Sequence, residues 1–249
     1  MRTHFLTALA LMTLCALQLS VCADALDSTW TRRSPLAGTI VKVIHAGDRF
    51  VAVGANGAIL TSPEGEEWTE QRSGTTAFLV SVAHGLGRFV AIDGDTDLVL
   101  TSPDAIRWTP HHTGLSRLQD VAVGQGMFVG VGLSGLIAVS SDGTQWEQVP
   151  RSTGCTLEAI AFGQGSFVVT AANTSRLLMS EDGRTWRAGW NTYATAQHAI
   201  CFGQTNFVSV GYLTSLAGTS GEATWQIGSL GEEDRKSTRL NSSHGKLYR

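Results

Sequence analysis

The chain has 249 residues, and its formal net charge of −3 with a pI near 6.1 gives no sign of a surface for nucleic acid or for an anionic membrane. Hydrophobic residues make up 43% of the chain, and its 28 glycines suit short strands joined by tight turns, so a disordered chain is excluded. We therefore predict a globular protein that binds no nucleic acid.

Residues 1–25 differ from the rest of the chain. An apolar run from Phe5 to Val21 follows a basic start and precedes small residues at Ala23 and Ala25, which is typical of a secretory signal peptide. A retained membrane anchor needs roughly 20 apolar residues, more than this run offers. Lipidation at Cys22 is a further alternative, disfavoured by the bulky valine before it. We predict a secreted or periplasmic protein with no membrane span after cleavage.

Residues 26–230 follow a repeat of about 39 residues. Tryptophan recurs at Trp30, Trp68, Trp108, Trp146, Trp186 and Trp225. Phenylalanine, followed each time by valine, recurs at Phe50, Phe89, Phe128, Phe167 and Phe207. Short apolar runs separated by glycine-rich turns surround these residues. The pattern predicts an all-β fold, a β-propeller in which each unit forms one four-stranded blade.

The two aromatic series do not match in number, because Trp30 has no phenylalanine-bearing partner strands. We therefore predict about five blades plus an orphan N-terminal outer strand, as part of a ring of six or more blades. Residues 231–249 show no strand pattern, and residues 235–244 are similar to translated sequencing-adaptor sequence. We predict an unstructured, non-native tail there, with a basic interaction tail as the alternative.

The turn between the third and fourth strands of each unit carries the most specific motif. A serine is followed two residues later by an acid, next by glycine in three of the units, and then by the tryptophan. The residues are Ser62, Glu64, Gly65 and Trp68; Ser102, Asp104 and Trp108; Ser140, Asp142, Gly143 and Trp146; and Ser180, Asp182, Gly183 and Trp186. Serine and aspartate side chains bind nearby backbone amides in turns, and glycine tolerates a left-handed conformation there.

These turns resemble the Asp-box of sialidase-like (BNR) propeller repeats, with one residue fewer between the acid and the glycine than in the commonest form. The resemblance implies that the acid and the hydroxyl hold the hairpin while the tryptophan packs between blades. It implies little about activity, because hydrolases and binding proteins both carry this repeat.

Residues for sialidase chemistry are not evident. The early Arg-Ile-Pro segment typical of that family is missing, and no glutamate–tyrosine pair stands out. Glycosidases of other families use two converging carboxylates. The carboxylates outside the repeated turns include Asp93, Asp95, Asp97, Asp120 and Glu158, and the sequence does not show whether any two converge. We predict that the protein is not an enzyme. A glycoside hydrolase with part of its active site outside this chain is the alternative.

Candidate metal ligands are few. Asp93, Asp95 and Asp97 alternate in one turn and offer the oxygen ligands that calcium prefers, but we favour aspartates that cap their own turn. His45 and His84 share one repeat position, which is apolar in the other units, so we expect interior imidazoles there. We predict no cofactor other than a possible calcium ion.

Two cysteines, Cys155 and Cys201, remain after signal cleavage. Cys201 occupies a slot that holds alanine in other units, which predicts a buried thiol. A disulfide between the two stays open in an oxidising compartment.

The loops that leave the fourth strand and those between the second and third strands emerge at one rim of a propeller, and they vary most between units. Trp190 lies outside the tryptophan repeat and, with Tyr193, Arg151 and Arg176, forms the predicted ligand-binding patch. Propellers of the photosystem II assembly-factor type show similar repeats and act by binding protein. We therefore predict a non-catalytic extracytoplasmic binding or scaffold module whose rim engages a protein or a glycan.

Overall fold

The computed structural model describes residues 39–150, 153–172, 176–191, 197–203, 205–211, 214–218 and 226–229. All of them belong to one compact unit, Leu36–Arg249. The predicted signal peptide, the predicted tail, Trp30 and Trp225 lie outside the described residues. No helix in the described part has the length and apolarity to cross a membrane.

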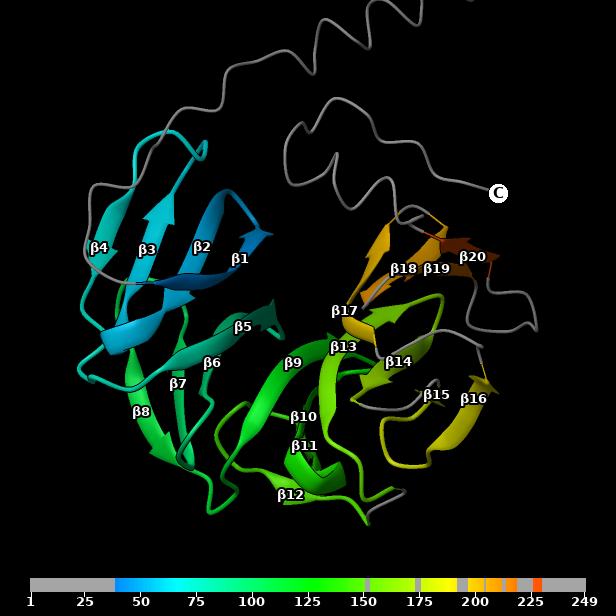
Figure 1. Ribbon diagram of the computed structural model, residues 1–249. Helices are drawn as coiled ribbons and strands as arrows, with labels where there is room; N and C mark the ends of the chain where they lie inside the picture. Colours follow the sequence, from blue (N-terminus) through cyan, green and yellow to red (C-terminus); the bar gives the residue numbers. More distant parts are fainter. Residues whose placement is uncertain are drawn as a thin grey trace, which may run out of the picture. The chain divides into compact units, whose positions relative to one another are not determined.

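The described residues form five four-stranded antiparallel sheets, which we call blades 1 to 5, and in each blade the strand order follows the sequence (Figure 1). Blade 1 contains β1 (Ile40–Ala46), β2 (Arg49–Gly54), β3 (Ile59–Ser62) and β4 (Thr69–Gln71). Blade 2 contains β5 (Leu79–Gly85), β6 (Arg88–Asp93), β7 (Leu98–Ser102) and β8 (Thr109–His112). Blade 3 contains β9 (Leu118–Gly124), β10 (Met127–Gly132), β11 (Ile137–Ser140) and β12 (Glu147–Gln148).

Blade 4 contains β13 (Leu157–Gly163), β14 (Ser166–Ala171), β15 (Arg176–Ser180) and β16 (Arg187–Asn191). Blade 5 contains β17 (Gln197–Gly203), β18 (Asn206–Gly211), β19 (Thr214–Gly218) and β20 (Gln226–Ser229). The predicted all-β fold of four-stranded blades is confirmed. The further unit expected from the unmatched tryptophan stays a prediction.

Tight hairpins join the first two strands of blades 1 to 4. Between β9 and β10, Gln125 and Gly126 both have positive φ (50° and 73°), as a type I′ turn requires. The innermost strands of blades 1 to 4 contact the innermost strand of the next blade, β1 with β5, β5 with β9, β9 with β13 and β13 with β17. The glycine-rich turns thus fold each unit back on itself while its first strand packs against the neighbouring unit.

The hydrophobic core lies between successive blades. Val51 and Val53 of blade 1 share one buried cluster with Leu79, Phe89 and Trp108 of blade 2. The same arrangement recurs between blades 2 and 3, 3 and 4, and 4 and 5. The clusters include the repeated tryptophans of blades 2, 3 and 4, Trp108, Trp146 and Trp186, as the repeat predicted.

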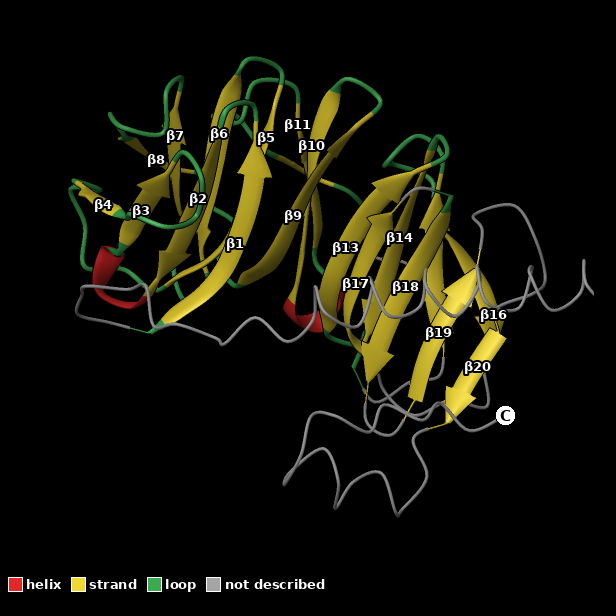
Figure 2. Cartoon of the chain, turned by 90° about the horizontal axis from the view of Figure 1, so that it is seen from above, coloured by secondary structure: helices red, strands yellow, loops and turns green. Residues whose placement is uncertain are grey.

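Each blade has two distinct ends (Figure 2). One end, which we call the hairpin end, carries the turns between strands one and two and between strands three and four. The other, which we call the rim, carries the connections between strands two and three and those between blades. The short 3₁₀ turns η1 (Ala55–Gly57) and η2 (Leu133–Gly135), red in Figure 2, lie at the rim.

Candidate functional site

The hairpin end is held by one repeated set of hydrogen bonds. In blade 3, Asp142 Oδ1 accepts from the backbone N–H of Thr144 at 2.8 Å and of Gln145 at 2.9 Å. The indole Nε1 of Trp146 donates to the Gly143 carbonyl at 3.1 Å. Ser140 Oγ accepts the Gly143 N–H at 2.8 Å. The carboxylate and the hydroxyl thus hold the turn, as the motif predicted, and the indole adds a further bond.

Blades 2 and 4 repeat these bonds. Asp104 accepts two backbone N–H groups in blade 2, and Asp182 does so in blade 4. Donation from backbone N–H groups lowers the pKa of Asp104 and of Asp142 to about 2 and holds the pKa of Asp182 far below its ordinary range. Ala105, with a φ of 59°, takes the place of the glycine in blade 2. These residues stabilise the turns of the hairpin end. Two hollows also lie at this end, one of about 310 Å³ beside Trp146 and Arg184 and one of about 380 Å³ beside Asp182.

In blade 1 the same turn contains Glu64 in place of aspartate. Ser62 Oγ accepts the Gly65 N–H at 2.8 Å, and Trp68 Nε1 donates to the Gly65 carbonyl at 3.1 Å. The longer Glu64 side chain is exposed and makes neither of the carboxylate bonds seen in the other turns. Only part of the predicted motif therefore acts in blade 1.

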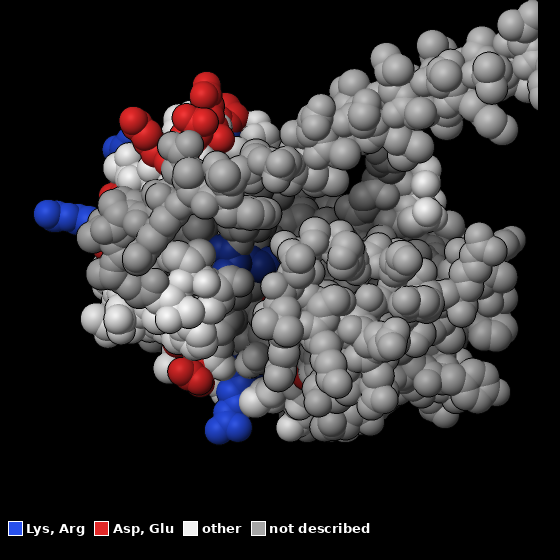
Figure 3. All heavy atoms as spheres, turned by 45° about the horizontal axis from the view of Figure 1, so that its top comes forward, with Lys and Arg blue, Asp and Glu red and all other residues white. Residues whose placement is uncertain are grey.

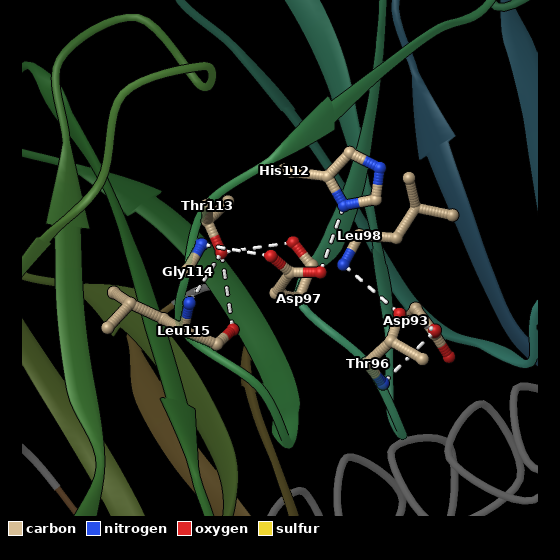
Figure 4. A network of polar contacts seen from close by, with 8 residues as sticks. All are labelled: Asp93, Thr96, Asp97, Leu98, His112, Thr113, Gly114 and Leu115. Atoms are coloured by element: carbon tan, nitrogen blue, oxygen red, sulfur yellow. Dashed lines mark hydrogen bonds and ion pairs between the residues drawn. The ribbon is translucent and has the colours of Figure 1, made fainter.

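At the rim of blade 2, Asp97 fastens the strand connection to the loop that leaves the blade (Figure 4). Its Oδ1 lies 3.0 Å from His112 Nδ1, and its Oδ2 accepts the Gly114 N–H at 3.2 Å. The hydrogen bond from His112, followed by that from Gly114, lowers the pKa of Asp97. The Asp97 carbonyl accepts the Thr113 N–H at 3.0 Å.

The three candidate calcium ligands do not converge, and Asp93 caps its own turn as expected. The buried Asp93 accepts the backbone N–H of Asp95 at 3.1 Å and of Thr96 at 3.2 Å, and it also accepts the Thr96 hydroxyl. Asp93 therefore caps its own turn, while Asp97 is directed to the next loop (Figure 4). Across the described ranges, no three His, Cys, Asp or Glu side chains are placed to hold a metal ion.

At the rim of blade 1 the equivalent junction leaves an open hollow of about 860 Å³. It is lined by Asn56, Gly57 and the segment Glu70–Thr76. Gly57 has a φ of 69°, and a Cβ there would lie 2.0 Å from the Thr75 carbonyl oxygen, so glycine is needed for the turn to meet the loop. The Gly57 N–H donates to the Ala77 carbonyl at 2.7 Å and fixes this contact. The exposed Phe78 follows the same loop, with 38% of its surface accessible.

The innermost strands of four blades meet at a buried carboxylate. Asp120 Oδ1 lies 3.0 Å from Lys42 Nζ of blade 1 and accepts the Ser81 hydroxyl of blade 2 at 2.6 Å. Asp120 Oδ2 accepts the Ile160 N–H of blade 4 at 3.0 Å. The Asp120 side chain is 4% exposed and that of Lys42 is 36% exposed. Figure 3 shows Lys and Arg atoms, blue, that lie deeper than the white atoms beside them. We call Lys42, Ser81, Asp120 and Ile160 the axial cluster.

A polar pair, separate from the axial cluster, lies on the innermost strands of blades 4 and 5. His198 Nδ1 is 2.5 Å from Glu158 Oε2, with side-chain exposures of 55% and 25%. A carboxylate that holds one imidazole nitrogen orients the ring and leaves Nε2 free to bind a ligand or exchange a proton. Asp120 and Glu158, two of the carboxylates noted in the sequence, thus lie on neighbouring strands β9 and β13.

The sequence contains a signal for the axial cluster that the aromatic repeat does not. Lys42, Ser81 and Asp120 each lie eight residues before the phenylalanine of their unit, a slot that holds alanine in blades 4 and 5. Three polar residues of matched chemistry at one position of successive first strands indicate side chains that meet at a common axis.

Other predicted site residues are only partly described. Arg151 and Tyr193 lie outside the described residues, and Arg176 and Trp190 are described only as backbone of β15 and β16. Their binding patch stays a prediction.

The predictions for the histidines and for Cys201 were wrong. His45 and His84 are exposed and pack against the rings of Phe50 and Phe89, with centroids 4.6 Å and 4.2 Å apart. Cys201 is exposed, and Cys155 is also a free thiol.

Comparison with known proteins shows the fold. No family model and no curated protein sequence matches the chain. Among solved structures it is similar to YCF48 bound to a D1 peptide, with 15% identity and a TM-score of 0.63 over 80% of this chain and 70% of that one. A streptogramin B lyase gives 13% identity and a TM-score of 0.69 over 78% of this chain and 70% of that one. The fold is that of a β-propeller.

A propeller in a nidogen/laminin complex also aligns, with 13% identity and a TM-score of 0.63 over 77% of this chain and 80% of that one. The β-propeller neighbours thus include a lyase and proteins solved with a peptide or in a protein complex. At these identities the likeness shows the architecture alone.

Proposed function

We propose that the protein is a non-catalytic binding module that works outside the cytoplasm and engages a protein or glycan partner through its rim. The observation that carries the proposal is the difference between two rims of one repeated frame. The hairpin ends of blades 2, 3 and 4 repeat the same carboxylate bonds, while the rim of blade 1 is an open polar hollow and that of blade 2 is closed by Asp97. Variation on a rigid frame is typical of a recognition surface.

The chemistry of the blade 1 rim suits a ligand rich in hydroxyl or amide groups. Glu70, Gln71 and Arg72 offer both donors and acceptors around the hollow. The exposed ring of Phe78 nearby can stack on a sugar ring or cover an apolar side chain of a peptide. A groove that combines convergent polar groups with an aromatic anchor is a common form of ligand site.

Two further observations support the proposal. The N-terminal apolar segment has the pattern of a secretory signal, which supports a location outside the cytoplasm. Structural neighbours include a propeller solved with a bound peptide and another in a protein complex, which supports a protein partner for this chain as well.

Binding of the purified chain to a peptide array and a glycan array tests the proposal. The exposed Arg72 lies at the hollow, whereas the half-exposed Arg184 lies at the hairpin end, so Arg72→Glu and Arg184→Glu are matched charge reversals. We expect saturable binding that Arg72→Glu weakens at least about tenfold and Arg184→Glu leaves unchanged. Equal affinities for the two variants would reject the rim as the binding surface. Release of free sugar from a bound glycan would favour the hydrolase alternative.

A further inference from the structure

The hollow at the rim of blade 1 is lined by two side chains of opposite charge that do not pair. Glu70 lies in β4, the outermost strand of blade 1, and Arg72 lies just beyond the end of that strand. Both line the hollow and both are exposed. Among the described residues, neither side chain forms an ion pair or a hydrogen bond. Each charge is therefore available to a ligand group of the opposite sign.

Blades 1 and 3 build this part of the rim in the same way. The glycines that end η1 and η2, Gly57 and Gly135, have φ values of 69° and 72°. A Cβ on Gly57 would lie 2.0 Å from the Thr75 carbonyl oxygen, and one on Gly135 would lie 1.9 Å from that of Thr153. Each turn thus meets the threonine of the loop that leaves its blade at the same close approach.

The two charges of blade 1 are absent at the same positions of blade 3. Counted from the tryptophan of each unit, Glu70 and Arg72 correspond to Gln148 and Pro150. Blade 3 therefore forms the same junction between turn and loop with no charge at either position. Because the junction does not need these charges, we assign Glu70 and Arg72 to the binding of a ligand.

The spacing of the charges fits an extended peptide. Side chains two residues apart in a strand face the same side and lie roughly 7 Å apart, at about 3.4 Å per residue. A segment with a base and an acid two residues apart therefore presents charges that match Glu70 and Arg72. A neutral sugar carries neither charge, and an acidic sugar carries only the negative one. The exposed ring of Phe78, which blade 3 replaces by Thr156, can cover an apolar side chain of the same segment.

We infer that the ligand of the blade 1 rim is an extended peptide segment with a basic and an acidic side chain two residues apart. The inference rests on the proposed function, because it names the partner of the same hollow. Glu70 receives the basic side chain, and Arg72 receives the acidic one. Exposed charge pairs are individually weak, so these two select the partner more than they add affinity.

A variant with exchanged charges tests this assignment. Glu70→Arg combined with Arg72→Glu keeps the net charge and reverses the order of the charges along the hollow. The probes are immobilised short peptides of one composition that contain Lys-x-Asp or Asp-x-Lys, and neutral peptides that contain Gln-x-Asn. We expect the original chain to prefer one charge order at least about tenfold, and the exchanged variant to prefer the other order by a similar factor. The same preference in both proteins, or equal binding of the neutral peptides by the original chain, would overturn the inference.

Blade 3 supplies the control for folding. Glu70→Gln combined with Arg72→Pro gives blade 1 the two residues with which blade 3 builds its junction. We expect this variant to lose the preference for one charge order and to keep the urea midpoint of the original chain. A clearly lower midpoint would mean that the two charges stabilise the loop, which would contradict their assignment to a ligand.

Further outcomes separate this inference from the proposal on which it rests. If a neutral glycan bound the original chain and lost affinity in Arg72→Glu, the rim would remain the binding surface and the peptide would be the wrong ligand. If no peptide and no glycan showed saturable binding, both the inference and the proposed function would be overturned.

Discussion

The hairpin end and the axis of this propeller use carboxylates in opposite ways. At the hairpin end, Asp104, Asp142 and Asp182 accept backbone N–H groups from their own turns, and each bond spans two or three residues. At the axis, Asp120 joins residues that lie 39, 40 and 78 positions away. A local bond can be repeated in any unit, whereas the axial bonds need a different residue from each blade.

The difference shows which positions of a repeat protein can vary from one unit to the next. Positions that fold a single unit are repeated because each unit must form the same hairpins. Residues at the axis and at the rim can differ from one unit to the next. Polar side chains that bind across units, such as Asp120 and Asp97, lie at these positions.

Replacing Asp120 should have the largest effect. Asp120→Ala removes a buried carboxylate and leaves the Ser81 hydroxyl and the Ile160 N–H without their acceptor. We expect the free energy of unfolding to fall by about 3 kcal/mol, as for other buried charges that lose one partner. Urea unfolding followed by tryptophan fluorescence measures the change.

Lys42→Met is the matched control for Asp120. The lysine is partly exposed, and the two other donors to Asp120 remain in the variant. We expect a loss of only about 1 kcal/mol. Equal losses for the two variants would mean that the ion pair, rather than the buried hydrogen bonds, joins the four blades.

Two glycines of the hairpin end should respond differently to the same substitution. Gly143 has a φ of 75°, and an added Cβ would lie 2.6 Å from Val90 Cγ2 of the neighbouring blade. Gly65 has a φ of 79°, but there the nearest atom would be Phe50 Cε2 at 3.5 Å, an ordinary contact. We expect a loss of about 2 kcal/mol for Gly143→Ala and about 1 kcal/mol for Gly65→Ala, measured by urea unfolding. Identical losses would mean that the contact between blades adjusts freely.

The turn carboxylates should make stability depend on acid pH. The pKa values of Asp104 and Asp142 lie at about 2 in the folded protein, below their ordinary value of 3.8. The stability they contribute is therefore present above about pH 4 and is lost as the pH falls from about 4 toward 2. We expect the midpoint of thermal unfolding to fall less steeply over this range in Asp142→Asn than in the original chain. Parallel curves would contradict the role of the ionised carboxylate.

The sequence predicts the parts of the fold that depend on one unit. The aromatic repeat locates the blades, and the Ser/Asp turns form because their bonds are local. The axial cluster escaped prediction because Lys42 and Asp120 become neighbours only once three units are placed around an axis. The burial of Cys201 was predicted wrongly for the same reason, since its slot is covered in other blades by a following unit. Asp97 binds His112 because the fold brings two loops together at the rim. This contact between loops could not be read from the spacing of the aspartates.

The smallest effect is expected from a substitution that gives the blade 1 turn the carboxylate bonds seen in blades 2, 3 and 4. Glu64→Asp places the shorter carboxylate where Asp104 stands in blade 2, behind the same Ser-Pro pair. The new side chain can then accept the backbone N–H groups of Glu66 and Glu67, as Asp104 accepts those of Ile106 and Arg107. We expect a gain of about 0.5 kcal/mol in the free energy of unfolding, limited by the two neighbouring glutamates. Glu64→Gln, which brings no shorter acceptor, should show no gain, and a loss in Glu64→Asp would mean that the blade 1 turn cannot adopt the geometry of the others.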